Sequence, residues 1–334
     1  MSRPGPHNAL TDVRGLLVGH YTDQRAASGV TVVVCLEDAV AGVDVRGSAP
    51  GTRETDLLDP VNLIQQVQAI CLSGGSVFGL AAADGVVDWL AGQGRGFSLD
   101  EGQVAPIVPA AVLYDLGRGP DFRPPISPEW GAWACQAATD GPLAMGSVGA
   151  GTGACSGGIK GGLGTASEVL DSGLVVGALV AVNSSGSVID PASGRPWEIG
   201  LELGGEFGQL GRRAVKLPPL AQPAPGRNTT IGLVATEALL SKAQAQKVAQ
   251  MAQDGLARAI RPAHTMFDGD TIFCLATGAK ELPQEPGFFE APQAQALTEI
   301  GRAAADCFAR AVIHGLLASE GLYGLPAFRD LDRL

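Results

Sequence analysis

The 334-residue sequence has few of the residues that bind transition metals. Its six cysteines and four histidines are scattered, and none forms a CxxC pair, an HExxH motif or a mixed Cys–His grouping. A structural or catalytic zinc site is therefore not expected. Each cysteine lies among apolar or small residues, which is typical of buried free thiols. We expect neither a metal nor another cofactor.

Long hydrophobic runs and positive charge are also scarce. The longest apolar run, around Gly173–Val182, is too short to cross a bilayer, and the N-terminus lacks the apolar region of a signal peptide. There are 23 lysines and arginines against 34 acidic residues, a formal net charge of −11. Nucleic acids and anionic lipids need basic surface. We therefore expect a cytoplasmic protein with no nucleic-acid or membrane partner.

Glycine, in contrast, is abundant, with 47 residues, and it is densest in the segment GSVGAGTGACSGGIKGGLG at 146–164. This segment contains neither GxxxxGK[ST] nor GxGxxG, which argues against nucleotide binding. The sequence also lacks GxSxG, the usual signature of an α/β-hydrolase. Dense glycine instead allows the backbone to pass close to an active site and to supply N–H donors there.

Hydrophobic periodicity predicts a layered α/β arrangement, with helices covering a sheet or a pair of sheets. Valine-rich strands are expected first, helices next, and strands again towards the C-terminus. Expected strands include Gly15–His20, Gly29–Cys35, Ala39–Val45, Val104–Leu113, Gly173–Asn183, Asn228–Ala235 and Thr271–Leu275. Expected helices are Val61–Val67, Ser76–Leu90 with Ser76 as N-cap, Ala238–Ile260 and Leu297–Leu316.

The segment Leu217–Gly226 carries four prolines in ten residues and is expected to be an exposed, extended connector. A linker between domains is one interpretation. However, an apolar strand starts within a few residues, at Ile231, and this suits a cleavage junction between Asn228 and Thr229. The Thr229 hydroxyl would attack the Asn228 carbonyl, and water would open the resulting ester. The freed α-amino group, with a reference pKa of ~7.7–8.0, could then act as the base for that hydroxyl.

The sequence around this junction resembles the P1 family of aminopeptidases. The likeness covers nearly the whole chain and is carried in order by NALTDVRGLLVGHYTD, LSGGSVFGLAAADGVVDWL, GSVGAGTGACSGGIKGGLGTAS, VGALVAVNSSGSVIDP and RNTTIGLVATEALL, which is followed by FDGDTIFCLATG. The family includes L-aminopeptidase/D-Ala-esterase/amidases, β-aminopeptidases, nylon-oligomer hydrolases and pantetheine-amide hydrolases. The resemblance implies a four-layer αββα sandwich like that of N-terminal-nucleophile hydrolases, with a different connectivity. It also implies one autoprocessed domain (1–334) that matures into a large chain (1–228) and a small chain (229–334).

Carried over by motif, Thr229 matches the family's nucleophile, where serine-type members have serine. Asp268 and Asp270, in FDGDT, match two positions that support the nucleophile. The double aspartate and the threonine both indicate the branch of the nylon-oligomer and pantetheine-amide hydrolases. One carboxylate would hold the Thr229 ammonium or hydroxyl while the other tunes its proton affinity. Without the family, the same pair would be interpreted as solvated carboxylates in a turn.

Three further residues match by motif. Asn183 matches an amide that stabilises the oxyanion, Tyr114 an active-site tyrosine that would orient the scissile carbonyl, and Lys160 a lysine of the nylon-hydrolase branch. Lys160 would favour an ionised aspartate or lower the pKa of the amine nearby. From the residues alone, Asn183 could simply end a strand, Lys160 could be a solvated loop charge, and Tyr114 could be a core aromatic.

The resemblance implies hydrolysis of small amides or peptides that carry a free amine, by a homo-oligomer, a tetramer of large and small chain pairs. Two alternatives remain open at this stage. An acyltransferase of similar fold would keep the self-cleavage but pass the acyl group to an amine. An unprocessed binding or scaffold protein would keep the fold without the chemistry.

Overall fold

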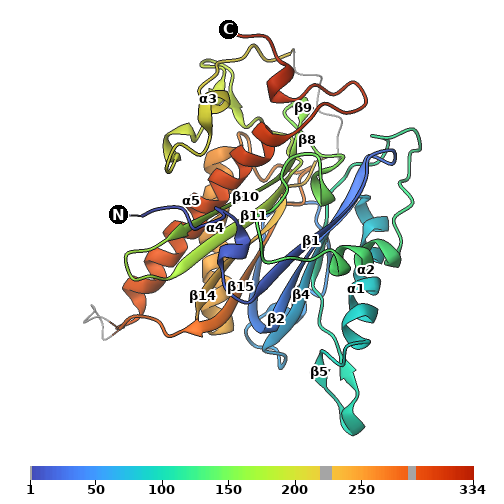
Figure 1. Cartoon of the computed structure of the whole chain (residues 1–334), viewed down its shortest axis with the longest axis vertical. Helices are drawn as coiled ribbons and strands as arrows, with labels where there is room; N and C mark the ends of the chain where they lie inside the picture. Colours follow the sequence, from blue (N-terminus) through green and yellow to red (C-terminus); the bar gives the residue numbers. More distant parts are fainter. Residues whose placement is uncertain (1, 219–227, 285–290) are drawn as a thin grey trace.

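The computed structural model describes residues 2–218, 228–284 and 291–334 (Figure 1). Apart from Leu217 and Pro218, the proline-rich connector lies outside the described residues. The main element is a mixed nine-stranded sheet of order β10-β11-β14-β15-β2-β4-β7-β3, with β1 paired to β2. Its strands are β1 (Leu16–Asp23), β2 (Ser28–Val45), β3 (Gly51–Arg53), β4 (Gln66–Ser73), β7 (Ala110–Val112), β10 (Gly162–Val169), β11 (Val175–Val182), β14 (Ile231–Ala238) and β15 (Thr271–Lys280).

Helices and short hairpins complete the fold. The helices are α1 (Ala82–Ala91), α2 (Pro128–Gln136), α3 (Gly208–Gly211), α4 (Lys242–Ala259) and α5 (Ala294–Ala318). Short 3-10 helices lie at Leu10–Asp12, Asp56–Leu58, Ser76–Ala81, Asp100–Gly102, Gly149–Gly151, Ile199–Leu201 and Phe328–Asp330. The two-stranded hairpins are β5 (Phe97–Ser98) with β6 (Val104–Ala105), β8 (Cys155–Ser156) with β9 (Ile159–Lys160), and β12 (Ile189–Asp190) with β13 (Arg195–Pro196).

Strand β2 divides the sheet into two layers. Its first half, Ser28–Cys35, pairs with β1, and its second half, Val40–Val45, pairs with β15. The register with β4 shifts between Val34 and Ala39, where an irregularity bends the strand. The sequence predicts two separate strands here, and the structure shows one long strand that belongs to both layers.

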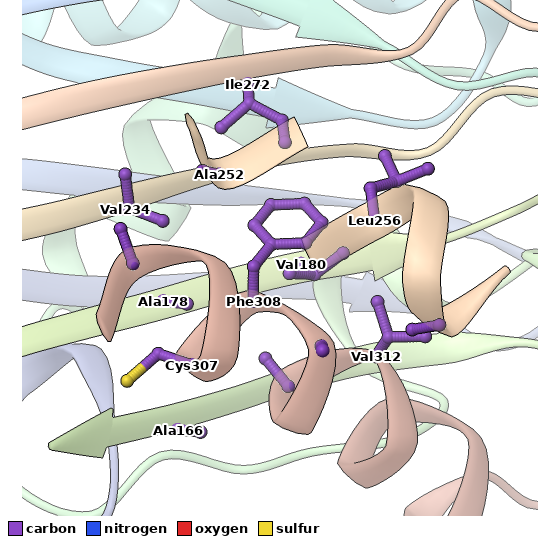
Figure 2. Close-up of a cluster of buried hydrophobic side chains, with 14 of the residues drawn as sticks. Ala166, Ala178, Val180, Val234, Ala252, Leu256, Ile272, Cys307, Phe308 and Val312 are labelled. Atoms are coloured by element: carbon purple, nitrogen blue, oxygen red, sulfur yellow. The ribbon is translucent and has the colours of Figure 1, made fainter. Parts of the chain in front are cut away.

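Three hydrophobic clusters separate four layers. One cluster packs α4 and α5 against β10, β11, β14 and β15, and Figure 2 shows its centre around Phe308. A second cluster lies between the two layers of the sheet, and a third packs α1 and α2 against β1, β2 and β4. The expected αββα sandwich is therefore confirmed.

The side chains of β14 show why its sequence is apolar throughout. Ile231 and Leu233 point into the cluster between the sheet layers, whereas Val234 and Ala238 point towards α4 and α5. A strand covered on both faces needs apolar residues at every position, without the alternation of a half-exposed strand. This central strand begins two residues after Thr229, which fixes the position of that threonine.

Three local predictions are wrong. Val61–Val67 is not a helix, because residues 61–64 form a turn and Gln66 starts β4. Ser76 does not cap α1, since it has a left-handed backbone (φ 52°) and starts a 3-10 helix that precedes α1. Helix α4 begins at Lys242, because β14 runs to Ala238 and Ser241 caps the helix through the Gln244 N–H.

Candidate active site

Thr229 lies at the start of β14 and is 5% exposed. The Thr229 N–H donates to the Asn183 carbonyl (2.5 Å), and the Thr229 hydroxyl donates to the carbonyl oxygen of Asn228. The Gly269 N–H donates to Thr229 Oγ1 (3.3 Å). The hydroxyl is therefore held against the carbonyl group of the peptide bond that precedes it.

Parallel pairing of β14 with β15 brings the FDGD motif to this threonine. Ile231 pairs with Thr271, so the residues just before each strand are neighbours at the same end of the sheet. Gly269 has no side chain because none would fit: a Cβ there would lie 3.0 Å from Thr229 Oγ1 and 2.6 Å from the Ala49 carbonyl oxygen. This close approach lets the Gly269 N–H reach the hydroxyl.

Asp270 connects this strand end to a histidine. Its Oδ1 accepts the Thr230 N–H (2.9 Å), and its Oδ2 accepts the His264 N–H (3.1 Å) and lies 2.9 Å from His264 Nδ1. The carboxyl group is 2% exposed. Asp270 thus holds the residue next to Thr229 and not the Thr229 hydroxyl itself.

Asp268 is held on the other side of Gly269. Its Oδ2 accepts the Thr265 N–H (2.9 Å) and the Thr265 hydroxyl (2.5 Å), and its Oδ1 accepts the Ser185 N–H (3.4 Å). Burial raises the pKa of the Asp268 carboxyl, the charge of Asp270 adds to this effect, and the hydrogen bonds from Thr265 and Ser185 oppose it. Because its pKa is raised, the ionised Asp268 carboxylate accepts a proton more readily than an ordinary aspartate does.

Asn183 follows β11 and is fully buried. Its Oδ1 accepts the Cys155 N–H (2.9 Å), and its Nδ2 donates to the Tyr114 carbonyl (3.0 Å). One of the two N–H groups of the amide is thus engaged, and a carboxamide has a second one to offer. The contact that Tyr114 makes with the site is through its main-chain carbonyl; its half-buried side chain is not part of this network.

Lys160 lies one step further from the threonine. It pairs across the β8–β9 hairpin with Cys155, whose N–H binds Asn183. Its Nζ donates to the carbonyls of Gly151 (2.9 Å) and Gly161 (2.8 Å). Burial lowers the pKa of Lys160 to about 7. Among the described residues, these contacts link Lys160 to Thr229 only through Cys155 and Asn183.

The structure adds His264, Thr265 and Ser185 to the residues predicted from the sequence. His264 has a left-handed backbone (φ 53°), and its Nε2 is buried without a hydrogen-bond partner among the described residues. The three lie near the motif residues in sequence, in HTMFDGD and NSS, but only the turn geometry directs their N–H groups at the carboxylates. A histidine and a threonine within four residues of the first carboxylate are the signal that could have indicated His264 and Thr265.

Within residues 2–218, 228–284 and 291–334, no cluster of three or more His, Cys, Asp or Glu side chains could hold a metal ion. Likewise, no helix in the described part of the chain is long and apolar enough to cross a membrane.

Comparison with known proteins places this geometry in context. The model of peptidase family S58 matches residues 8–327. An uncharacterized aminopeptidase of Mycobacterium tuberculosis is 49% identical over 97% of this chain and 98% of its own length. A 6-aminohexanoate-oligomer endohydrolase of Kocuria sp. is 29% identical over 90% of this chain and 84% of its own length.

Solved structures show the same fold. A β-aminopeptidase of Burkholderia sp. matches with a TM-score of 0.71 and 25% identity, covering 96% of this chain and 89% of that chain. The L-aminopeptidase D-Ala-esterase/amidase of Ochrobactrum anthropi, described as a variant of the N-terminal-nucleophile hydrolase fold, matches with a TM-score of 0.74 and 24% identity. That alignment covers 99% of this chain and 91% of the other. The expected relationship to the N-terminal-nucleophile hydrolase fold is confirmed.

Proposed function

The chain belongs to peptidase family S58 and is a hydrolase of peptide or amide bonds, and on that premise we propose that it matures by cutting itself before Thr229. Thr229 then serves as the N-terminal nucleophile of an aminopeptidase or amidase. The observation that supports this proposal is that the Thr229 hydroxyl lies against the Asn228 carbonyl group. The Gly269 N–H donates to the hydroxyl oxygen, Thr229 Oγ1.

Self-cleavage would proceed by transfer of the acyl group from nitrogen to oxygen. Thr229 Oγ1 attacks the Asn228 carbonyl carbon and loses its proton, the C–N bond breaks, and the nitrogen takes up a proton. Water then hydrolyses the ester, which leaves an Asn228 carboxylate and the free α-amino group of Thr229. The Asn183 carbonyl already accepts a hydrogen bond from that nitrogen, so the new amine is held where the amide was.

Turnover would reuse the same pair of atoms. The α-amino group, with a reference pKa of ~7.7–8.0, takes the hydroxyl proton as Oγ1 attacks the substrate carbonyl. The proton passes to the leaving amine, an ester forms on Thr229, and water releases the acid. The second N–H of Asn183 would stabilise the oxyanion, an effect often worth about 10²–10³ in rate.

The remaining predicted residues take supporting roles in this proposal. Asp270 fixes Thr230 and hence the direction of the nucleophile, whereas Asp268, with its raised pKa, is suited to exchange a proton with the nearby amine. Lys160 is the buried cation behind Asn183, and its lowered pKa allows it to change charge near neutral pH. Tyr114 would orient the substrate carbonyl.

We propose small peptides or linear amides with a free amine as substrates. The 49% identical mycobacterial relatives bear aminopeptidase names, and the relatives at 27–29% identity are named for 6-aminohexanoate oligomers, so both α-peptides and linear amides are candidates. A cytoplasmic homo-oligomer of processed pairs remains part of the proposal. Turnover assays with and without an added acceptor amine separate hydrolysis from acyl transfer.

The test compares wild type with Thr229→Ala and Thr229→Ser. Intact-mass analysis of wild type should give two chains, the smaller one starting at Thr229, and Thr229→Ser should also mature because it keeps a hydroxyl. Thr229→Ala should remain a single inactive chain with an unchanged circular dichroism spectrum. An active wild-type enzyme made of one uncut polypeptide would overturn the proposal.

A further inference from the structure

A polar cavity lies next to Lys160, one of the candidate site residues. Its volume is about 180 Å³, and it is lined by Gly117 and Arg118, Gly153, Lys160 and the turn at 322–325. Thr229 does not line it. The cavity is joined to the site through Lys160, whose cross-strand partner Cys155 binds Asn183.

Two cationic side chains face this cavity. The ammonium of Lys160 has three N–H donors and uses two on main-chain carbonyls, so one remains. The Nε of Arg118 is buried and has no hydrogen-bond partner among the described residues. Arg213 and Arg258 also have an unpaired buried Nε, so this atom alone does not indicate a ligand. The two terminal nitrogens of Arg118 likewise form no hydrogen bond or ion pair with the described residues and are not buried, so they are the donors that an anion in the cavity can reach.

The nearest acid does not neutralise these cations by contact. Both carboxyl oxygens of Asp115 are engaged elsewhere, by the Ser28 hydroxyl (2.7 Å) and the Gly75 N–H (2.6 Å). Burial raises the pKa of Asp115 to about 6, against the opposing effects of these hydrogen bonds and of Arg118. Within the described part of the chain, neither Arg118 nor Lys160 forms an ion pair.

The two cations also act on each other. Burial is the main cause of the lowered pKa of Lys160, the charges of Cys155 and Asp115 oppose this effect, and the charge of Arg118 adds to it. Two cations that line the same cavity favour an anion there, because the anion's charge reduces the repulsion between them. A guanidinium can bind a carboxylate or a phosphate through two parallel hydrogen bonds. The lining of the cavity includes these two cations and no acidic residue, although the chain as a whole has a formal charge of −11.

We propose that this cavity is a subsite for an anionic group of the substrate, a carboxylate or phosphate bound by Arg118 and Lys160. This inference rests on the proposed function and restricts the range of substrates proposed there. The preferred substrates are amides that carry an acidic group at one end of the molecule, a short distance from the scissile bond. Arg118 determines specificity and takes no part in the chemical step.

The kinetic test uses sets of three aminoacyl amides that differ only in the terminal group. This group is a carboxylate, a phosphate ester or a neutral methyl. Wild type should prefer an anionic member, with a KM at least about tenfold below that of the neutral one. Arg118→Gln should abolish most of this preference. Arg118→Lys, which keeps the charge but loses the planar fork, should keep part of it. Arg212→Gln, a change at an exposed arginine outside the cavity, should leave the preference intact.

The proposal would be overturned if wild type showed no preference for the anionic substrates. It would also be overturned if Arg118→Gln left the ratio of the KM values of the neutral and anionic substrates unchanged. The carboxylate and phosphate arms show which anion is bound. If Arg118→Gln does not fold, the salt dependence of wild type decides: the KM of the anionic substrate should rise with ionic strength while that of the neutral one stays constant.

Calorimetry separates this inference from the proposed function. Titration of 4-acetamidobutyrate and of inorganic phosphate into wild type and Arg118→Gln measures the cavity without any turnover. If the protein binds either anion through Arg118 but neither cleaves itself nor hydrolyses amides, the anion subsite is supported and the Thr229 mechanism is contradicted. If the protein matures and turns over normally but shows no Arg118-dependent binding, the Thr229 mechanism is supported and the anion subsite is contradicted.

Discussion

His264 holds Asp270 with two nitrogen donors, the main-chain N–H and Nδ1, from a left-handed backbone conformation. A non-glycine residue with φ of 53° is uncommon, and asparagine adopts this conformation more readily than most residues. The hydrogen bond to Asp270 fixes the direction of this carboxylate, and Asp270 in turn binds the N–H of Thr230, next to the proposed nucleophile Thr229. His264 is therefore a positioning residue.

Substitutions at His264 should separate its two contributions. His264→Asn keeps a side-chain N–H near the Nδ1 position and tolerates the backbone, so maturation should slow little. His264→Leu removes the donor, and we expect self-cleavage and kcat to fall by about ten- to a hundredfold, the equivalent of one charge-assisted hydrogen bond. Cleavage is followed by denaturing electrophoresis and kcat by amide turnover.

A purely structural role would lower the melting temperature of His264→Leu and leave the kcat of its folded fraction unchanged. Normal cleavage and normal kcat in His264→Leu would rule out the positioning role.

The motifs predicted candidate residues that the structure brings close together, but they did not predict the residues that a turn adds to the same network. Thr229, Asp268 and Asp270 are close together as the resemblance implies, because each precedes one of two paired strands. Arg118 had no such signal. Its approach to Lys160 depends on the packing of residues more than 40 positions apart, and no local periodicity encodes that.

At the level of secondary structure, the long elements were predictable and the bend of β2 was not. Helices α4 and α5 carry apolar residues at helical spacing, and the structure confirms both with altered ends. In contrast, Gln66–Ser73 could be assigned to a strand only once β2 and β7 were known to lie on either side of it. The apolar residues at 61–67 resemble a helical turn, and tertiary pairing overrides that pattern.

Helix α5 contributes Phe308 to the cluster beneath it, where this side chain is fully buried (Figure 2). Its ring lies against Gly232 of β14. A Cβ at Gly232 would lie 3.0 Å from the Phe308 ring, so the glycine makes room for the phenyl group. Phe308→Ala should lower the free energy of unfolding by about 3–5 kcal/mol, and Phe308→Leu by clearly less, because it refills part of the cavity. Urea denaturation in the uncut Thr229→Ala background, where a single chain unfolds, measures both. Equal midpoints for the two variants and the Thr229→Ala parent would show that the ring contributes nothing.

On the scale of the whole molecule, the proposed cut would break the polypeptide, but both resulting chains would remain parts of the same sheet. Strand β14 pairs with β11, and β15 pairs with β2, so strands after Thr229 lie between strands that precede it. Helix α5 packs in the same cluster as β10 and β11 (Figure 1). The pieces would have 228 and 334 − 228 = 106 residues.

Because of this interleaving, the cut chains should stay together under native conditions. Native gel filtration of matured protein should give one peak that contains both chains, and only denaturant should separate them. The uncut Thr229→Ala protein serves as the size reference. Elution of a free 106-residue chain at neutral pH would contradict this arrangement.

The position of the bend in β2 also determines where the insertion of a residue would disturb the fold. Side chains alternate between the two faces of a strand, so one extra residue between Leu36 and Asp38 would turn Ala39 and Ala41 out of the cluster between the sheet layers. The same slip would pull Arg46 and Gly47 away from the Asp270 carbonyl oxygen that their N–H groups bind. An insertion far from Thr229 in sequence would therefore displace the segment around Asp270, which lies next to Thr229 in the structure.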